Sequence, residues 1–374
     1  MPPAPGAGVS PTTVVAGLPL LRRIVLAAVR AGFADIRVHR ALAGTGDALT
    51  GTPAVPLEPT GLRAPRRIVL LPANVVPQPH WLRSLLEVEL RGETAYVDSS
   101  LTAVIETEDA ARVLAAAAEC GSAAELVAAL RAGFDDPPIV FDAAGRFPLA
   151  TPRDVAGAED WLLRGLIKQS EGFLSRHLER RISLALTRRL VATRITPDAM
   201  TLVSVAIGLL GAPFFLSTAP RSQLAGALLF LAHSILDGCD GELARLTFRE
   251  SRRGAILDFW GDNVVHVAVF ACIALCWSLA AGTAWPLLLG AITIGSALGS
   301  AACVFRRTML DLVPAAGAAA TERIADAMAH RDFIYLVVLL SAVGRVDWFL
   351  ILASVGTPIF FLLLLWVGPA RRTA

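Results

Sequence analysis

From Pro197 onward the sequence is dominated by apolar stretches long enough to cross a lipid bilayer. A membrane-spanning helix needs roughly 20 mostly apolar residues. The chain of 374 residues has 55% hydrophobic and only 18% charged residues, with a mean hydropathy of +0.59. These values exclude an ordinary soluble protein and predict an α-helical integral membrane domain of six transmembrane helices. The predicted spans are 198–217, 223–244, 254–279, 284–305, 333–344 extended by its flanks, and 347–367.

The first of these stretches has a well-marked beginning. Thr196 is a good helix N-cap, and Pro197 suits the first helical turn because its missing N–H group would be unpaired there anyway. The opening residues MPPAPGAGVSPTT contain no basic region followed by an apolar run, so no cleaved signal peptide is predicted. Membrane insertion is therefore expected to depend on the later helices.

Positive charge is distributed unevenly among the loops between the predicted spans. Arginines gather after spans two, four and six, whereas the other loops contain little beyond Arg221 and Arg345. Because cytoplasmic loops carry the excess of Lys and Arg, both termini are predicted to be cytoplasmic, in a protein of the cell inner membrane. The arginines on this side are Arg245, Arg249, Arg252, Arg253, Arg306, Arg307, Arg323, Arg331, Arg371 and Arg372.

A basic segment, residues 156–195, precedes the membrane domain. Its alternation of apolar and basic residues predicts one or two amphipathic helices on the anionic cytoplasmic leaflet, and a solvated linker helix is the alternative. The abundance of Leu, Ile and Phe on the other face favours the membrane surface. The basic residues are Arg164, Lys168, Arg176, Arg180, Arg181, Arg188, Arg189 and Arg194.

Four aspartates interrupt the apolar region between spans two and three. Asp237 and Asp240 are three residues apart, and Asp258 and Asp262 are four apart, so each pair lies on one helix face. The short loop between the two helices makes them antiparallel neighbours, which allows the two acidic faces to meet. Since an acid in the hydrocarbon core is energetically costly, such residues normally mark a functional site.

Four carboxylates in one pocket would repel each other, and divalent cations relieve that repulsion. Hard oxygen ligands suit Mg²⁺, Mn²⁺ or Ca²⁺, and Mg²⁺ often keeps a substrate phosphate in its shell. Two other interpretations stay open: an ion pathway in a transporter or channel, and a set of structural ion pairs. The partners of such pairs would be Arg245, Arg249, Arg252 and Arg253.

The stretch resembles the signature of the CDP-alcohol phosphotransferases. It reads Asp237-x-x-Asp240-Gly241-x-x-Ala244-Arg245-x8-Gly254-x3-Asp258-x3-Asp262, and all eight signature positions are filled at the expected spacing. The resemblance implies a fold of six transmembrane helices, usually dimeric. It also implies a reaction in which a CDP-linked alcohol donates its phosphoryl-alcohol group to a second hydroxyl and releases CMP.

The same resemblance implies a role for each signature residue. Asp237, Asp240 and Asp258 would hold two divalent ions, Mg²⁺ or Mn²⁺, and Asp262 would contribute to the second ion and act as general base. Asp237, together with Gly241, Ala244 and Gly254, would line the pocket for cytidine and pyrophosphate, and Arg245 would position the donor. The implied partners are a CDP-alcohol donor, an alcohol acceptor, the lipid bilayer and a second copy of the chain, with no nucleic acid.

The first 155 residues alternate in an α/β manner, which predicts a small sheet covered by helices. GLPLLRRIVLAAVRAGF and ATPRDVAGAEDWLLR resemble parts of the nucleotidyltransferase domain that is fused to some members of this family, as in bifunctional inositol-phosphate cytidylyltransferases joined to a di-inositol-phosphate synthase. The match departs at the chemistry: a Gly-rich phosphate loop with a basic residue is missing, and Asn74 and Ala150 stand where metal-binding aspartates are expected. We therefore predict a degenerate domain without cytidylyltransferase activity.

The remaining polar residues are interpreted as structural. His80 and Asp98 are predicted to be surface or core residues, and His233 and His266 interior histidines, because hard-cation sites favour oxygen ligands. Arginines within residues 306–331 could bind an acceptor phosphate or act as ordinary anchors, which the generality of the positive-inside bias favours. The domains are thus 1–155, 156–195 and 196–370, and the alcohols, CDP-diacylglycerol or a CDP-inositol donor and an inositol phosphate acceptor among them, stay open.

Overall fold

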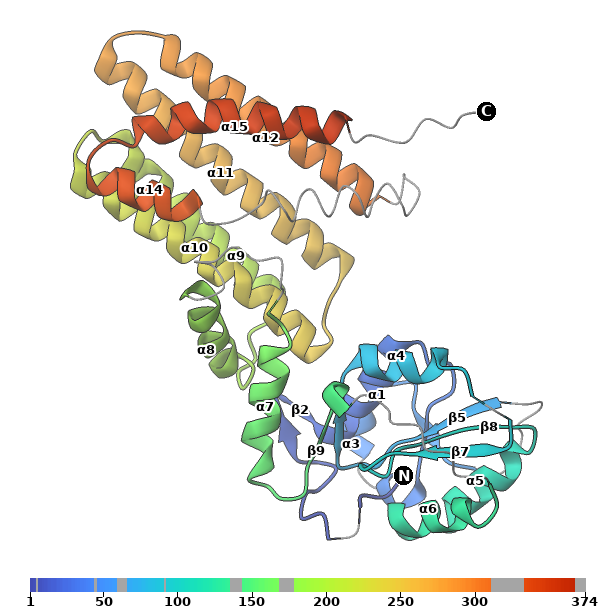
Figure 1. The fold of residues 1–374 in the computed structure, drawn as a ribbon. Coiled ribbons are helices and arrows are strands. Elements are labelled where there is room, and N and C mark those ends of the chain that lie inside the picture. The colour runs from blue at the N-terminus through green and yellow to red at the C-terminus, as the bar shows by residue number, and fades with distance from the viewer. Residues whose placement is uncertain are drawn as a thin grey trace, which may run out of the picture. The chain divides into compact units, whose positions relative to one another are not determined.

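The computed structural model describes residues 1–4, 6–43, 46–58, 66–90, 92–134, 143–167, 178–310 and 333–366. The chain divides into two compact units, Met1–Arg164 and Gly165–Ala374 (Figure 1). The first is an α/β domain and the second is helical throughout its described residues.

The first unit is built around a three-stranded antiparallel sheet in which β8 lies between β5 and β7 (Figure 1). Ile105 of β8 is opposite both Ile68 and Ala95, and its side chain is buried with Val113 and Leu126 of the helices that cover the sheet. Three further strand pairs are short: β1–β2, β3–β4 and β6–β9. The strands are β1 Val14–Val15, β2 Leu18–Pro19, β3 Arg37–Val38, β4 Val55–Pro56, β5 Arg66–Leu70, β6 Val75–Pro77, β7 Thr94–Val97, β8 Ala103–Thr107 and β9 Arg146–Pro148.

The helices of this unit confirm the α/β pattern of the sequence, including the helix followed by a strand near its start and the Ala-rich helix after the sheet. They are α1 Leu20–Ala31, α2 Arg40–Ala43, α3 Gly46–Leu49, α4 Pro79–Glu87, α5 Ala110–Glu119, α6 Ala123–Arg131, η1 Ala143–Gly145 and α7 Asp154–Arg164.

The helix α7 belongs to the first unit, so that unit ends nine residues later than the predicted boundary at 155. Its apolar side chains Ala158, Leu162 and Leu163 are buried. Its Glu159 carboxylate accepts a hydrogen bond of 2.8 Å from the backbone N–H of Ala16. These contacts fasten the helix to the domain, whereas the sequence pattern grouped it with the basic segment that follows.

The second unit contains five helices among the described residues that are long and apolar enough to cross a membrane. They correspond to predicted spans one to four and six; predicted span five is described as the shorter apolar helix α14. The helices are α8 Arg180–Leu190, α9 Pro197–Gly211 continued by η3 Ala212–Leu216, α10 Pro220–Thr247, α11 Arg252–Ala281, α12 Trp285–Thr308, α14 Phe333–Ala342 and α15 Asp347–Trp366.

The ends of these helices follow from their sequences. Thr196 caps α9 by accepting a hydrogen bond from the N–H of Ala199, as predicted, and Pro197 occupies the first turn. Ser251 caps α11 in the same way through the N–H of Gly254. The link between these helices is short, because α10 ends at Thr247 and α11 begins at Arg252. It brings the acidic parts of the two helices together.

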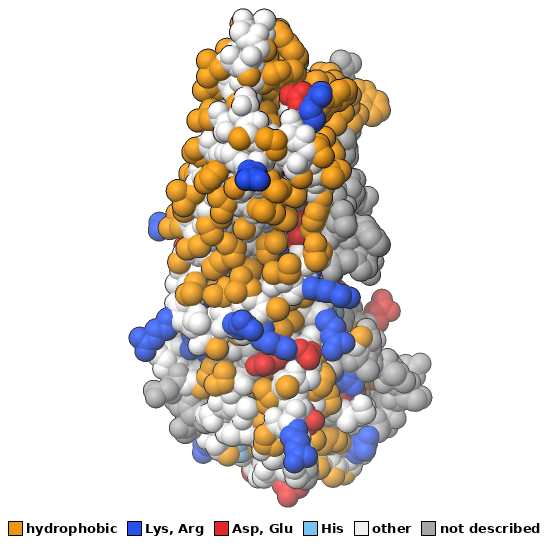
Figure 2. Space-filling view, turned by 90° about the vertical axis from the view of Figure 1, so that its left-hand side faces the viewer, with side chains coloured by type: hydrophobic (Ala, Val, Ile, Leu, Met, Phe, Trp, Pro, Cys, Tyr) orange, Lys and Arg blue, Asp and Glu red, His pale blue; other side chains and the backbone are white. Residues whose placement is uncertain are grey.

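Close helix contacts and an apolar exterior complete this unit. Gly211 of α9 and Gly226 of α10 face each other's backbone, since a Cβ atom at either position would lie about 3 Å from the other's carbonyl oxygen. Large apolar side chains such as Leu279 and Leu288 are exposed, and hydrophobic side chains cover much of the visible helical surface (Figure 2). In a membrane protein such a surface faces lipid.

Two of the basic residues predicted to share one side connect helix ends. Arg252, at the start of α11, donates to the carbonyl of Met309 just beyond α12, and Arg307 near the end of α12 donates to the carbonyl of Leu364 in α15. Arg323, Arg331, Arg371 and Arg372 lie outside the described residues.

Candidate active site

Three of the four predicted aspartates form one cluster. Asp237 and Asp240 of α10 are buried and Asp258 of α11 is half-buried, and one carboxylate oxygen from each lies within 4.8 Å of the others. The spacing of three residues puts the first two on one face of α10, and the short link to α11 brings the third against them. The structure thus produces the meeting of acidic faces that the sequence predicted.

The cluster has the chemistry of a hard-cation site. Carboxylates gathered this closely in a poorly solvated place repel each other, and a divalent cation offsets that repulsion. All ligand atoms are oxygens, which Mg²⁺ and Mn²⁺ prefer. The three residues therefore fit a divalent ion of that kind.

Thr201 of α9 orients one member of the cluster. Its hydroxyl donates a hydrogen bond to Oδ2 of Asp240, and both side chains are buried. Thr201 was not among the residues predicted from the sequence, although a polar side chain one turn inside an apolar span indicates a possible functional position. The hydrogen bond fixes the plane of the Asp240 carboxylate.

The fourth aspartate, Asp262, lies one turn further along α11 and is not part of the three-residue cluster. Its side chain is 35% exposed, and it contacts a histidine from each helix. Nε2 of His233 on α10 lies 3.2 Å from Oδ1, and Nδ1 of His266 on α11 lies 3.7 Å from Oδ2. The histidines are thus interior residues that contact a carboxylate, which the sequence did not predict.

The other signature residues surround the cluster. Gly241 follows Asp237 by one turn, and a Cβ atom there would lie 3.1 Å from the guanidinium of Arg245; Ala244 is half-buried beside them. Gly254, in the first turn of α11, faces α9, where a Cβ atom would lie 2.9 Å from Oδ1 of Asp198. The missing side chains at the two glycines make room for the Arg245 guanidinium and the Asp198 carboxylate to lie against the helix backbone.

A third acid on α10 has a different environment. Glu242 has no exposed surface, and its carboxylate accepts hydrogen bonds from Arg180 at 2.6 Å and from Ser183 and Thr187 at 2.7 Å each. All three donors are on α8, one of the described helices of the predicted basic segment. This helix is therefore fastened to α10 through polar contacts, a feature that its apolar and basic pattern did not reveal.

The arginines considered for an acceptor phosphate are only partly described. Arg306 and Arg307 close α12, and Arg307 is bonded to the carbonyl of Leu364. Arg323 and Arg331 lie outside the described residues.

In the first unit, Asn74 and Ala150 stand where the resemblance expects metal ligands. The Asn74 amide accepts from the N–H of Ala4 and donates to the carbonyl of Leu149, both at 2.9 Å. The carbonyl of Ala150 accepts from the N–H of Gly8 at 2.8 Å. These groups hold the N-terminal segment in place instead of presenting carboxylates.

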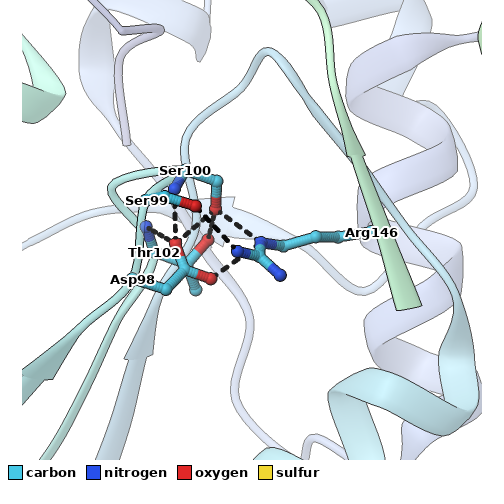
Figure 3. A network of polar contacts seen from close by, with 5 residues as sticks. All are labelled: Asp98, Ser99, Ser100, Thr102 and Arg146. Carbon is cyan, nitrogen blue, oxygen red and sulfur yellow. Dashed lines mark hydrogen bonds and ion pairs between the residues drawn. The ribbon is translucent and has the colours of Figure 1, made fainter. Parts of the chain in front are cut away.

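The same unit contains a buried ion pair that joins the β7–β8 turn to β9 (Figure 3). Nε of Arg146 lies 2.7 Å from Oδ2 of Asp98, and both side chains are about 5% exposed or less. The other carboxylate oxygen accepts from the N–H groups of Ser100 and Thr102. Asp98 is thus a core residue with structural partners, as predicted.

Residues 194–360 match the family model for CDP-alcohol phosphatidyltransferase. The matched segment contains the whole aspartate and glycine signature and helices α9 to α12. This part of the chain is therefore similar to the CDP-alcohol phosphatidyltransferase family, whose named relatives are enzymes that transfer substituted phosphate groups.

Two kinds of relative are similar to part of this chain. A "Bifunctional IPC transferase and DIPP synthase" of Rubrobacter xylanophilus is 42% identical over 146 residues, which cover 38% of this chain and 33% of that protein. A CDP-diacylglycerol--serine O-phosphatidyltransferase of Mycobacterium tuberculosis is 37% identical over 100 residues, covering 27% of this chain and 33% of that protein. The chain thus matches about a third of the length of these relatives.

Among solved structures, the chain is similar to a Mycobacterium tuberculosis phosphatidylinositol phosphate synthase with CDP-DAG bound. The identity is 22%, the match covers 52% of this chain and 99% of that chain, and the TM-score is 0.37.

Proposed function

We propose that this chain is a divalent-metal-dependent CDP-alcohol phosphotransferase. The observation that carries the proposal is the meeting of Asp237, Asp240 and Asp258 within 4.8 Å, inside a domain of the matching family. An ion pathway would also use acids, but it would not explain the glycines and Arg245 at fixed spacing around them.

The three clustered aspartates are the metal ligands in this proposal, with Asp262 contributing to a second ion. Bound Mg²⁺ or Mn²⁺ would neutralise the donor's pyrophosphate and the charge that develops on the departing CMP. Thr201 donates a hydrogen bond to Asp240 and would hold that carboxylate in a fixed orientation for the ion.

Asp262 is the proposed general base. The acceptor hydroxyl gives its proton to this carboxylate while its oxygen forms a new bond to the phosphorus atom nearest the donor alcohol. The bond from that phosphorus to the CMP oxygen breaks, and CMP leaves with the electron pair. The partial exposure of Asp262, in contrast to the buried Asp237 and Asp240, leaves room for an acceptor beside it.

The donor's cytidine and pyrophosphate are proposed to lie along Gly241, Ala244 and Gly254, with Asp237 at the same pocket. Without side chains at the two glycines, Arg245 and Asp198 lie close to the helix backbone, where they would border the nucleotide. Arg245 projects past Gly241 and supplies a positive charge for a phosphate.

The membrane arrangement completes the proposal. Six transmembrane helices, with α14 as part of the fifth, would place both termini and the active-site mouth on the cytoplasmic side of the inner membrane. The functional unit would be a homodimer. The first unit would be a degenerate nucleotidyltransferase-like domain, because Asn74 and Ala150 offer hydrogen bonds to the chain itself and no carboxylate to a metal ion.

The substrates are proposed at the level of class. The serine phosphatidyltransferase relative is named for CDP-diacylglycerol, and the bifunctional relatives for IPC transferase and DIPP synthase activity. CDP-diacylglycerol and CDP-inositol are therefore the donors to offer, and inositol phosphates are the first acceptors.

The decisive experiment measures CMP release by the purified full chain in lipid with Mg²⁺ or Mn²⁺, using each donor against a panel of polyol and polyol-phosphate acceptors. We expect metal-dependent release that Asp262→Asn abolishes. Glu250→Gln changes an exposed acid in the link between α10 and α11 and serves as the matched control. Absence of release with every pair, together with no thermal stabilisation by CDP, would contradict the proposal, and ion flux in proteoliposomes would then favour the transport interpretation.

A further inference from the structure

Two histidines inside the membrane-spanning helices contact opposite oxygens of Asp262. His233 comes from α10 and His266 from α11, with nitrogen–oxygen distances of 3.2 and 3.7 Å. A carboxylate only accepts hydrogen bonds at ordinary pH, so the nearer nitrogen, Nε2 of His233, is the donor. Asp262 is thus held between imidazoles from the two helices that build the acidic cluster.

The ring of His233 is held in position by its neighbours on α10 and α9. It is only 1% exposed, and it stacks on Phe230 with ring centroids 6.2 Å apart and planes inclined by 20°. On the α9 side Gly208 makes room, because a Cβ atom there would lie 3.0 Å from Cγ of His233. The ring cannot turn away from Asp262 without displacing these neighbours.

The second histidine is fixed by the same aromatic cluster. Phe230 meets the ring of His266 edge-on at 5.3 Å, and Phe333 of α14 lies 5.8 Å from it. A buried polar ring such as that of His233 is costly unless it makes a specific contact. For His233 that contact is Asp262, and the partly buried His266 lies near the same carboxylate.

We propose that His233 and His266 are positioning residues that aim the Asp262 carboxylate at the acceptor hydroxyl, a role that rests on the proposed function of Asp262. The hydrogen bond at Oδ1 fixes the carboxylate plane, and Oδ2 is the oxygen that receives the acceptor's proton. The histidines do not touch the substrate. The transfer step keeps the balance given above: the O–H bond breaks, the O–P bond forms, and the P–O bond to CMP breaks.

Kinetics of the full chain in lipid test this role. His233→Phe keeps the ring stacking but removes the donor, and we expect kcat for CMP release to fall by about 10- to 100-fold, with unchanged KM for the donor. His233→Gln retains an N–H donor and should recover part of that loss. His266→Phe should have the smaller effect because its contact is longer, and His80→Phe, an exposed position of the first unit, should have none.

A spectroscopic readout tests the contact without requiring activity. In protein labelled with ¹⁵N-histidine, the protonated Nε2 resonance of His233 should shift in Asp262→Asn and should keep its position in the control Glu250→Gln. An Nε2 resonance of His233 that does not shift in Asp262→Asn would overturn the proposal even if CMP release is confirmed. An increased KM with normal kcat in His233→Phe would also overturn it. A wild-type chain that shows the spectral contact but releases no CMP would refute the proposed function and, with it, the positioning role.

Discussion

The two units of this protein each contain a buried aspartate site, and the two sites treat negative charge in opposite ways. In the membrane unit, Asp237, Asp240 and Asp258 gather like charges within 4.8 Å. In the α/β unit, Asp98 is surrounded by donors and lies 2.7 Å from Arg146 (Figure 3).

The acidic cluster is the proposed ligand site, whereas the Asp98–Arg146 pair supports the fold. A buried ion pair with satisfied hydrogen bonds supports local structure, and it weakens the fold when one partner is removed. A cluster of like charges works against the fold until a cation binds. Neutralising one carboxylate of the cluster should therefore lower activity without lowering stability. Neutralising Asp98 should lower stability without lowering activity.

The largest effect is expected at the cluster. Asp258→Asn removes one proposed metal ligand, and CMP release should fall by more than about 100-fold. Substitution of a residue that only supports a metal ligand already lowers activity by up to about 100-fold. Because the substitution also relieves repulsion, the unfolding temperature measured without divalent ions should stay the same or rise. A variant that is unstable without metal yet retains activity would break the comparison.

The corresponding change in the α/β unit should act on stability alone. Asp98→Asn leaves the Arg146 guanidinium buried without its counter-charge, and we expect a local loss of about 3 kcal/mol. Hydrogen exchange of the β7–β8 turn in the full chain should accelerate, while CMP release in lipid stays at the wild-type rate.

A matched control is the pair Arg67–Glu106, which also has a distance of 2.7 Å but is 21% and 41% exposed. Glu106→Gln should change stability by less than about 1 kcal/mol because water solvates the charges. Equal effects of the two substitutions would show that burial does not decide the contribution of the ion pair.

Glu242 tests an intermediate case, since it is an acid of the membrane unit with the partners of a structural residue. Glu242→Gln keeps hydrogen-bonding atoms near Ser183 and Thr187 but removes the charge opposite Arg180. Loss of this charge-assisted contact should cost about 1.5 kcal/mol and increase hydrogen exchange in α8. Unchanged exchange in α8 would indicate that other contacts hold this helix on α10.

The smallest effect is expected at Asp154, which begins α7 at the surface. Hydrogen bonds from the backbone N–H groups of Thr151 and Ala150 lower the pKa of this carboxyl below its ordinary value of 3.8. Its stabilisation of the α7 turn is therefore fully present above about pH 4 and is lost as the pH falls through the lowered pKa. In Asp154→Asn, hydrogen exchange of this turn should lack that pH dependence.

Local periodicity explains what the sequence alone determined. Apolar stretches of membrane-spanning length predicted the positions of five long helices, and the cap at Thr196 predicted the start of α9. Spacings of three and four residues placed each pair of aspartates on one helix face, because helical geometry is set over a single turn. The short link between α10 and α11 then required the two acidic faces to meet.

Only the tertiary structure decided which distant side chains support the sites. Thr201 and Asp240 are 39 residues apart, Arg180 and Glu242 62 apart, and His233 and Asp262 29 apart. Such contacts depend on how helices pack and rotate against each other, and a single sequence does not encode that in a short repeating pattern. The acids proposed to bind metal could therefore be found from their spacing, whereas the residues that contact them became visible only in the folded chain.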